Sequence, residues 1–168
     1  MSIVIADTSP INYLLVMGYI ELLPHLYGQI ILPESVHGEL LDEGSSGIVG
    51  LWARSLPAWI SVRKPSTPAV LPAGRLHQGE IDAIALAEEL KANLVLMDDG
   101  VGVRFALARG LTITGTLGVL VEAAQNDIVE IDAVLNKLKS TDFRATPGLY
   151  ERARNLALAK PPIAPRRK

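Results

Sequence analysis

Two short aliphatic runs, each followed directly by acidic residues, most constrain what this chain can fold into. Residues 3–6 (IVIA) precede Asp7, and residues 94–97 (LVLM) precede Asp98 and Asp99. An uninterrupted apolar run with β-branched residues is typical of a strand buried on both faces of a parallel sheet. Because such sheets bind their ligands at the carboxyl ends of the strands, both runs bring carboxylates to the same functional edge.

The rest of the chain alternates between strand and helix patterns. Further strands are predicted at residues 29–32, 59–62 and 111–114, and residues 44–50 are predicted to form a loop. Helical patterns occur at about residues 9–16, 20–26, 34–43, 51–56, 78–92, 103–109, 117–125, 131–138 and 149–159. This alternation predicts an α/β fold, a three-layer α/β/α sandwich with a mainly parallel sheet of about four or five strands.

The length and composition fit one compact domain. The chain has 168 residues, of which 49% are hydrophobic and 20% charged, so it can bury a core and is not a disordered chain. We expect a single domain over residues 1–159. Residues 160–168 (KPPIAPRRK) are rich in proline and basic residues, and we expect them to form a flexible basic tail.

Several classes of site are excluded by residues that the sequence lacks. There is no cysteine, which removes disulfide scaffolds, thiolate nucleophiles and cysteine-based zinc sites, and the three histidines lack zinc-ligand spacing. Residues 100–105 (GVGVRF) begin like a dinucleotide-binding motif, but Phe105 stands where the third glycine belongs. No phosphate-binding P-loop motif is present, which argues against hydrolysis of nucleoside triphosphates of that kind.

Charge and hydropathy bear on partners and location. The net charge of −2 argues against binding nucleic acid through a bulk positive field, and an aromatic content of 5% argues against base stacking on an aromatic platform. The N-terminal residues do not resemble an export signal, and no apolar stretch reaches the ~18 residues that span a bilayer. We therefore expect a cytoplasmic protein that does not associate with membranes.

The acidic residues at the strand ends also have a structural interpretation. Asp7 could cap the following helix, although Thr8 and Ser9 could do so as well. Asp98 and Asp99, followed by a glycine, form a good signal for a turn and a helix start. From the sequence alone, both interpretations remain open.

Two glutamates in predicted helices are equally ambiguous. Glu80 falls in a first helical turn, where a carboxylate gains about 0.3–1 kcal/mol from the helix dipole. Glu39 falls within a helix, where it could simply be solvated, and Glu34 or Glu43 could take its place in any functional assignment.

A site built from these residues would contain only oxygen ligands. Hard oxygen ligands without cysteine or paired histidines suit Mg²⁺ or Mn²⁺. Such ions offset the repulsion between carboxylates, activate water and stabilise charge developing on phosphate. The sequence therefore favours phosphodiester hydrolysis as the reaction.

The order of elements and the acidic positions resemble a PIN domain, the nuclease fold of many prokaryotic toxins of toxin–antitoxin pairs. The resemblance extends over about residues 3–138. It rests on short motifs along the chain: Asp7-Thr8-Ser9, Pro33 with Val36 and Glu39-Leu40, Gly79-Glu80 with Ala83-Ile84 and Leu86-Ala87, and Leu96-Met97-Asp98-Asp99. Residues 115–120 (GTLGVL) resemble a segment of a less characterised PIN-like subgroup.

The resemblance also implies roles for individual residues. The catalytic acidic set would be Asp7, Glu39, Glu80, Asp98 and Asp99, with the metal ion held by Asp7, Glu80 and either or both of Asp98 and Asp99. Substrate contacts would come from Thr8, Ser9 and Arg104. The chain departs from the subgroup at Val103, where an arginine is common, and Arg104 is adjacent.

The implied function is that of a Mg²⁺- or Mn²⁺-dependent endoribonuclease of the toxin type. Its expected partners are an RNA substrate, a small antitoxin protein that blocks the site, and a second copy of the chain in a homodimer. The alternative is a catalytically weak PIN-like module that keeps the fold and binds nucleic acid or protein without measurable turnover.

Overall fold

The computed structural model describes residues 2–42, 47–68, 74–98 and 100–159, which fall into two compact units that divide after Thr116. The predicted tail, residues 160–168, lies outside the described residues. The first unit contains the sheet and the second consists of helices, and each is described by itself.

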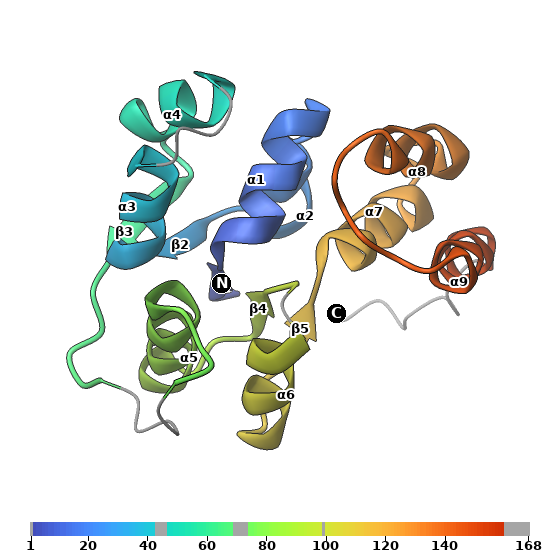
Figure 1. Ribbon diagram of the computed structural model, residues 1–168. Helices are drawn as coiled ribbons and strands as arrows, with labels where there is room; N and C mark the ends of the chain where they lie inside the picture. Colours follow the sequence, from blue (N-terminus) through green and yellow to red (C-terminus); the bar gives the residue numbers. More distant parts are fainter. Residues whose placement is uncertain (1, 43–46, 69–73, 99, 160–168) are drawn as a thin grey trace, which may run out of the picture. The chain divides into compact units, whose positions relative to one another are not determined.

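The first unit is built on a five-stranded, all-parallel sheet (Figure 1). Its strands are β1 (Val4–Ala6), β2 (Ile30–Pro33), β3 (Ile60–Arg63), β4 (Leu94–Leu96) and β5 (Ile113–Thr114). They lie in the order β3-β2-β1-β4-β5. This confirms the predicted α/β fold, with strands within a residue or two of the positions expected from the apolar runs.

Helices cover both faces of this sheet. They are α1 (Thr8–Met17), α2 (Leu22–Tyr27), α3 (Glu34–Asp42), α4 (Gly47–Arg54), α5 (Gln78–Leu90) and α6 (Gly100–Ala108). Figure 1 shows α1 and α2 on the side of the sheet away from α5 and α6. The layers are those of an α/β/α sandwich.

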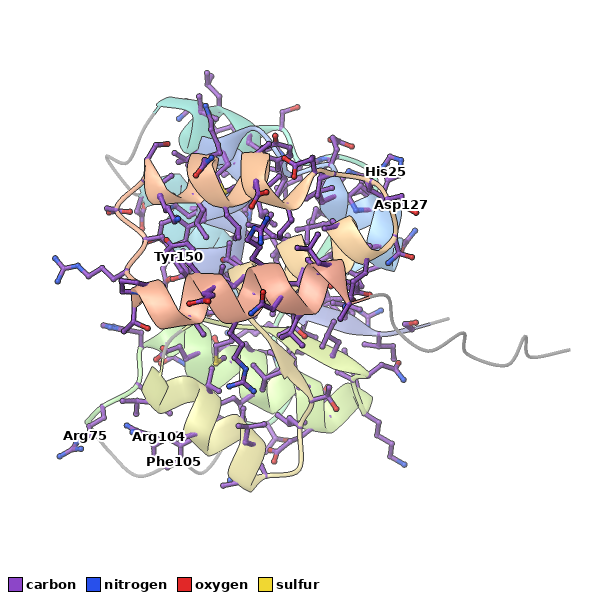
Figure 2. The ribbon with its side chains drawn as sticks, turned by 90° about the vertical axis from the view of Figure 1, so that its right-hand side faces the viewer. His25, Arg75, Arg104, Phe105, Asp127 and Tyr150 are labelled. Atoms are coloured by element: carbon purple, nitrogen blue, oxygen red, sulfur yellow. The ribbon has the colours of Figure 1, made fainter. Side chains whose placement is uncertain are left out.

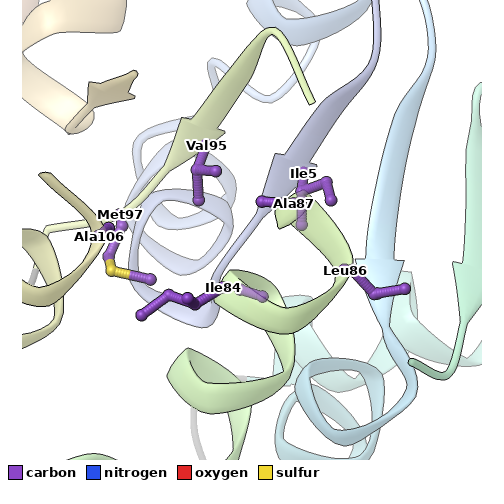
Figure 3. Packing of buried hydrophobic residues seen from close by; sticks show 8 residues of the cluster. Ile5, Ile84, Leu86, Ala87, Val95, Met97 and Ala106 are labelled. Carbon is purple, nitrogen blue, oxygen red and sulfur yellow. The ribbon is translucent and has the colours of Figure 1, made fainter. Parts of the chain in front are cut away.

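A cluster of buried hydrophobic residues lies between α5 and the central strands. Ile84 and Ala87 of α5 pack with Ile5 of β1 and Val95 of β4, all at most 1% exposed (Figure 3). Met97, directly after β4, and Ala106 of α6 complete the same cluster. Because α5 packs against both β1 and β4, this packing fixes the position of its first turn relative to the carboxyl ends of the two strands.

The expectation of a loop at residues 44–50 was wrong for its last part. Helix α4 begins at Gly47 and buries Val49, Gly50 and Ala53. It packs against α3, and His37 of α3 bonds through Nε2 to the carbonyl oxygen of Ala53 at 2.8 Å. Two glycines make this segment a poor helix former by itself, so tertiary packing outweighs its local preference.

The second unit contains helices α7 (Thr116–Gln125), which starts at the last residue of the first unit, α8 (Ile131–Lys139) and α9 (Pro147–Leu158). Helix α8 packs its apolar face against α9, and Arg154 of α9 pairs with Asp132 of α8 at 2.7 Å. Of the helices that the structure describes in either unit, none combines the length and apolarity needed to cross a membrane.

Candidate active site

The site is positioned by the point at which the sheet changes direction. From β1 the chain adds β2 and β3 on one side, and it later adds β4 and β5 on the other. Strands β1 and β4 therefore lie side by side, with Ala6 paired to Leu96, and the Asp7 N–H donates to the Leu96 carbonyl at 2.9 Å. At such a switch point the carboxyl ends of adjacent strands leave a crevice for ligands.

Asp7 is buried at this edge, with 4% of its surface exposed. It occupies the N-cap position of α1, but its side chain makes no capping hydrogen bond, so capping does not account for the acid here. Burial raises the pKa of Asp7 to about 7; a backbone hydrogen bond from Thr8 opposes the shift, and the negative charges of Glu80, Glu39 and Asp98 add to it. The charges of three further carboxyl groups thus act on Asp7.

Glu39 reaches this edge from α3. Its Oε2 accepts a hydrogen bond of 2.5 Å from the Thr8 hydroxyl, which ties α3 to the first turn of α1. Glu34, which the sequence left as an equivalent candidate, is exposed in the first turn of α3. Ser9 lies half-buried beside Thr8, and Glu43 lies outside the described residues.

Glu80 comes from the first turn of α5 and is 4% exposed. Its Oε2 accepts a hydrogen bond of 2.8 Å from the backbone N–H of His77, so the carboxylate also takes part in capping the N-terminus of α5. The structural and the functional interpretation of Glu80 are therefore compatible: the contact that closes the helix also fixes the carboxylate at the sheet edge.

Asp98 follows β4 and points to the start of α7. Its Oδ1 accepts the backbone N–H of Thr116 at 2.7 Å, and its Oδ2 accepts the Thr116 hydroxyl at 2.5 Å. Burial raises the pKa of Asp98, and these two hydrogen bonds oppose the increase. Asp99, the other member of the predicted pair, lies outside the described residues.

Three glycines leave room for these carboxylates. A β-carbon on Gly79 would lie 2.9 Å from Oε1 of Glu39 and 3.3 Å from Oδ1 of Asp7. A β-carbon on Gly102 would lie 3.2 Å from Oε1 of Glu80, and one on Gly115 would lie 2.5 Å from Oδ1 of Asp98. A side chain at Gly79 or Gly115 would displace an acid, whereas one at Gly102 would first meet the Met97 sulfur at 2.8 Å and would also press on Glu80.

The sequence did not assign Thr116, Gly102 or Gly115 to the site. A signal for two of them was present, since Gly115 and Thr116 directly follow the last predicted strand and therefore reach the same edge as Asp98. Gly102 had no such signal, because its contact with Glu80 depends on how α6 packs against α5.

The cluster contains only oxygen donors, the chemistry that Mg²⁺ and Mn²⁺ prefer. Within the described ranges, however, no three acidic or histidine side chains are arranged as ligands of one metal ion. The hydrogen bonds explain why the side chains are not arranged as metal ligands. Oxygens of Glu39, Glu80 and Asp98 accept hydrogen bonds from other groups of the protein. The donor set fits such an ion, and its binding would replace some of these bonds.

The fold and the acidic edge define an α/β protein whose site is lined by carboxylates. A family model described as a PIN domain matches residues 3–158, nearly the whole chain, and the protein therefore belongs to the PIN-domain family. The PIN domain is a nuclease fold, which implies a nucleic-acid substrate. Searches of curated proteins and of solved structures found no match for this chain.

The raised pKa of Asp7 predicts a pH-dependent difference in stability between the wild type and Asp7→Asn, both metal-free. Between pH ~4 and pH ~7 the unfolded chain releases a proton that native Asp7 retains, so Asp7 lowers the wild type's free energy of unfolding as pH rises. We expect near-equal stability at pH 4 and an advantage of up to about 4 kcal/mol for Asp7→Asn at pH 8. Urea unfolding in EDTA measures this, and a pH-independent difference would contradict it.

The close approach of Gly79 to two acids predicts a second outcome. Gly79→Ala would push Glu39 or Asp7 aside, so we expect a loss of nuclease activity and no gain in stability. The matched control is Gly38→Ala in α3, where nothing lies within 4 Å of the new β-carbon and replacing a helical glycine stabilises by ~0.5–1 kcal/mol. Thermal unfolding and a cleavage assay on both variants test this; equal activities would refute it.

Proposed function

We propose that this PIN-domain protein is a divalent-metal-dependent endoribonuclease that hydrolyses RNA phosphodiester bonds at its acidic edge. The observation that carries this is the burial of Asp7 among Glu39, Glu80 and Asp98, which raises its pKa to about 7. Gathering like charges in a buried position opposes folding, and a bound cation would offset that cost. Helix capping alone does not explain the arrangement, because the Asp7 side chain makes no capping hydrogen bond to α1.

The proposed metal ligands are Asp7, Glu80 and Asp98, together with Asp99 beyond the described part of the site. Bound Mg²⁺ or Mn²⁺ would supply an activated water and stabilise charge developing on the phosphate. The rigid placement of the ligands comes from the chain itself: β1 and β4 fix the two aspartates, and the first turn of α5 fixes Glu80.

Glu39 is proposed as the group that accepts the proton of the attacking water. It is half-buried, so water can reach it, and the Thr8 hydroxyl on Oε2 holds it beside Gly79. Thr8 and Thr116 then act as positioning residues, because each orients a carboxylate. We also propose contacts to the substrate from Thr8, Ser9 and Arg104, the last of which is exposed on α6.

An RNA cleavage assay tests the proposal. We expect the purified protein to cleave RNA with Mg²⁺ or Mn²⁺ and to stop when EDTA is added. Asp7→Asn, Glu39→Gln, Glu80→Gln and Asp98→Asn should each lower the rate about 100-fold or more, since each removes a group that stabilises the transition state.

The control is Glu21→Gln, an exposed carboxylate outside the cluster, which should cleave at the wild-type rate. Undiminished cleavage in EDTA would exclude the metal mechanism. Binding of RNA without cleavage by any metal-loaded sample would favour the alternative, a PIN-like binding module.

We further propose a cytoplasmic, toxin-type role, in which the chain is a single domain over residues 1–159 and forms a homodimer that a small antitoxin inhibits. The support is electrostatic: Asp7 is buried beside three carboxyl groups whose negative charges act on it, and such an edge favours a basic side chain from an inhibitor.

Expression in a bacterial host tests this role. We expect the wild type to arrest growth and Asp7→Asn to be harmless at the same protein level. Co-expression with the neighbouring gene should restore growth and yield a complex on size exclusion. Normal growth with active, uninhibited wild-type enzyme would show that the nuclease is not a toxin.

A further inference from the structure

A hollow of about 330 Å³ lies against one face of α6, in the same unit as the acidic edge. It is lined by Val101, Arg104, Phe105 and Ala108 of α6 and by Arg75 from the segment before α5. Figure 2 labels Arg75, Arg104 and Phe105, which gather on the same side of the unit. The volume is at the lower end of the range for small-ligand sites.

The spacing of the α6 residues explains how the hollow is formed. Positions 101, 104, 105 and 108 repeat every three to four residues, so they share one helix face. Gly102 and Ala106 lie on the buried face, and Gly102 approaches Glu80. One helix thus separates the acidic edge from the hollow, and the hollow extends over about 10 Å of that helix.

The hollow combines two cations with an aromatic ring. Arg75 and Arg104 are exposed, and neither guanidinium forms an ion pair with a carboxylate in the described ranges. Phe105 is half-buried: it packs partly against the core cluster and also lines the hollow. Guanidinium groups bind phosphate oxygens, and an aromatic ring stacks on a base, so the combination suits a nucleotide.

A larger hollow in the second unit is also lined by basic side chains, but these already interact with neighbouring residues. It measures about 470 Å³, but its Arg154 is paired with Asp132 and its Lys139 lies 4.9 Å from the Tyr150 ring centre. Its cations are therefore already engaged, whereas Arg75 and Arg104 of the α6 hollow have no carboxylate partner among the described residues.

We propose that the α6 hollow binds one unpaired nucleotide of the RNA substrate, with its phosphate against Arg75 and Arg104 and its base against Phe105. This rests on the proposed function and adds a contact for one nucleotide outside the acidic edge, made by a single ring rather than by an aromatic platform. It also addresses how a chain of net charge −2 holds a polyanion: the attraction is local, one helix away from the acids.

Binding of a fluorescent single-stranded RNA, measured by anisotropy in the Asp7→Asn background, tests the proposal without turnover. Arg75→Gln and Arg104→Gln should each weaken binding about tenfold and lower the slope of log affinity against log salt by about one. Phe105→Leu should weaken binding about tenfold, whereas Phe105→Tyr, which keeps a ring, should bind like the parent.

The control is Arg63→Gln, an exposed arginine on β3 at the far edge of the sheet, which should leave the affinity unchanged. Duplex RNA, whose bases are already stacked, should be insensitive to Phe105→Leu. Thermal unfolding of each variant shows that it is folded. Equal losses for all three arginine variants, equal affinity of the leucine and tyrosine variants, or no RNA binding by the folded parent would overturn the proposal.

The result is separable from that of the proposed function. If the wild type cleaves RNA with Mg²⁺ but the hollow variants bind like the control, the nuclease stands and the hollow proposal is wrong. If no metal supports cleavage but binding depends on Arg75, Arg104 and Phe105 as described, the hollow is a nucleotide site on a non-catalytic module.

Discussion

The pairing of β1 with β4 is the constraint on which the rest of the site depends. It places the backbone of Asp7 within hydrogen-bonding distance of Leu96, two residues before Asp98. The α3 and α5 helices pack against each other and against β2, which brings Glu39 and Glu80 to the same edge. A strand order without this neighbour relation would have scattered the same acids over the surface.

Placing four acids close together costs free energy, and the surrounding structure offsets part of that cost. The Thr8 hydroxyl donates to Glu39, the His77 N–H donates to Glu80, and both donors of Thr116 bond Asp98. Hydrogen bonds to a charged group contribute about 1.5–3 kcal/mol each and so offset part of the cost of burying these carboxylates. The pKa of Asp7 stays raised, chiefly because its carboxyl group is buried.

Much of this could be predicted from the sequence, because the strands are short apolar runs and the rule that ligands bind at strand ends needs only their positions. That rule placed Asp7, Asp98 and Asp99 at the same edge of the sheet, and the structure adds that the two strands concerned, β1 and β4, are neighbours. It could not choose Glu39 over Glu34, since both lie on α3 and only its packing decides which one faces Thr8. The start of α4 and the approach of Gly102 to Glu80 likewise depend on contacts between distant segments.

The glycines beside the acids have a consequence for how such a site tolerates mutation. Gly79, Gly102 and Gly115 carry no reactive group, but a side chain at any of these positions would enter space next to a carboxylate. Intolerance to substitution around this edge therefore reports excluded volume as much as chemistry. A substitution at this edge can therefore fail because the new side chain is too large as well as because an acid is lost.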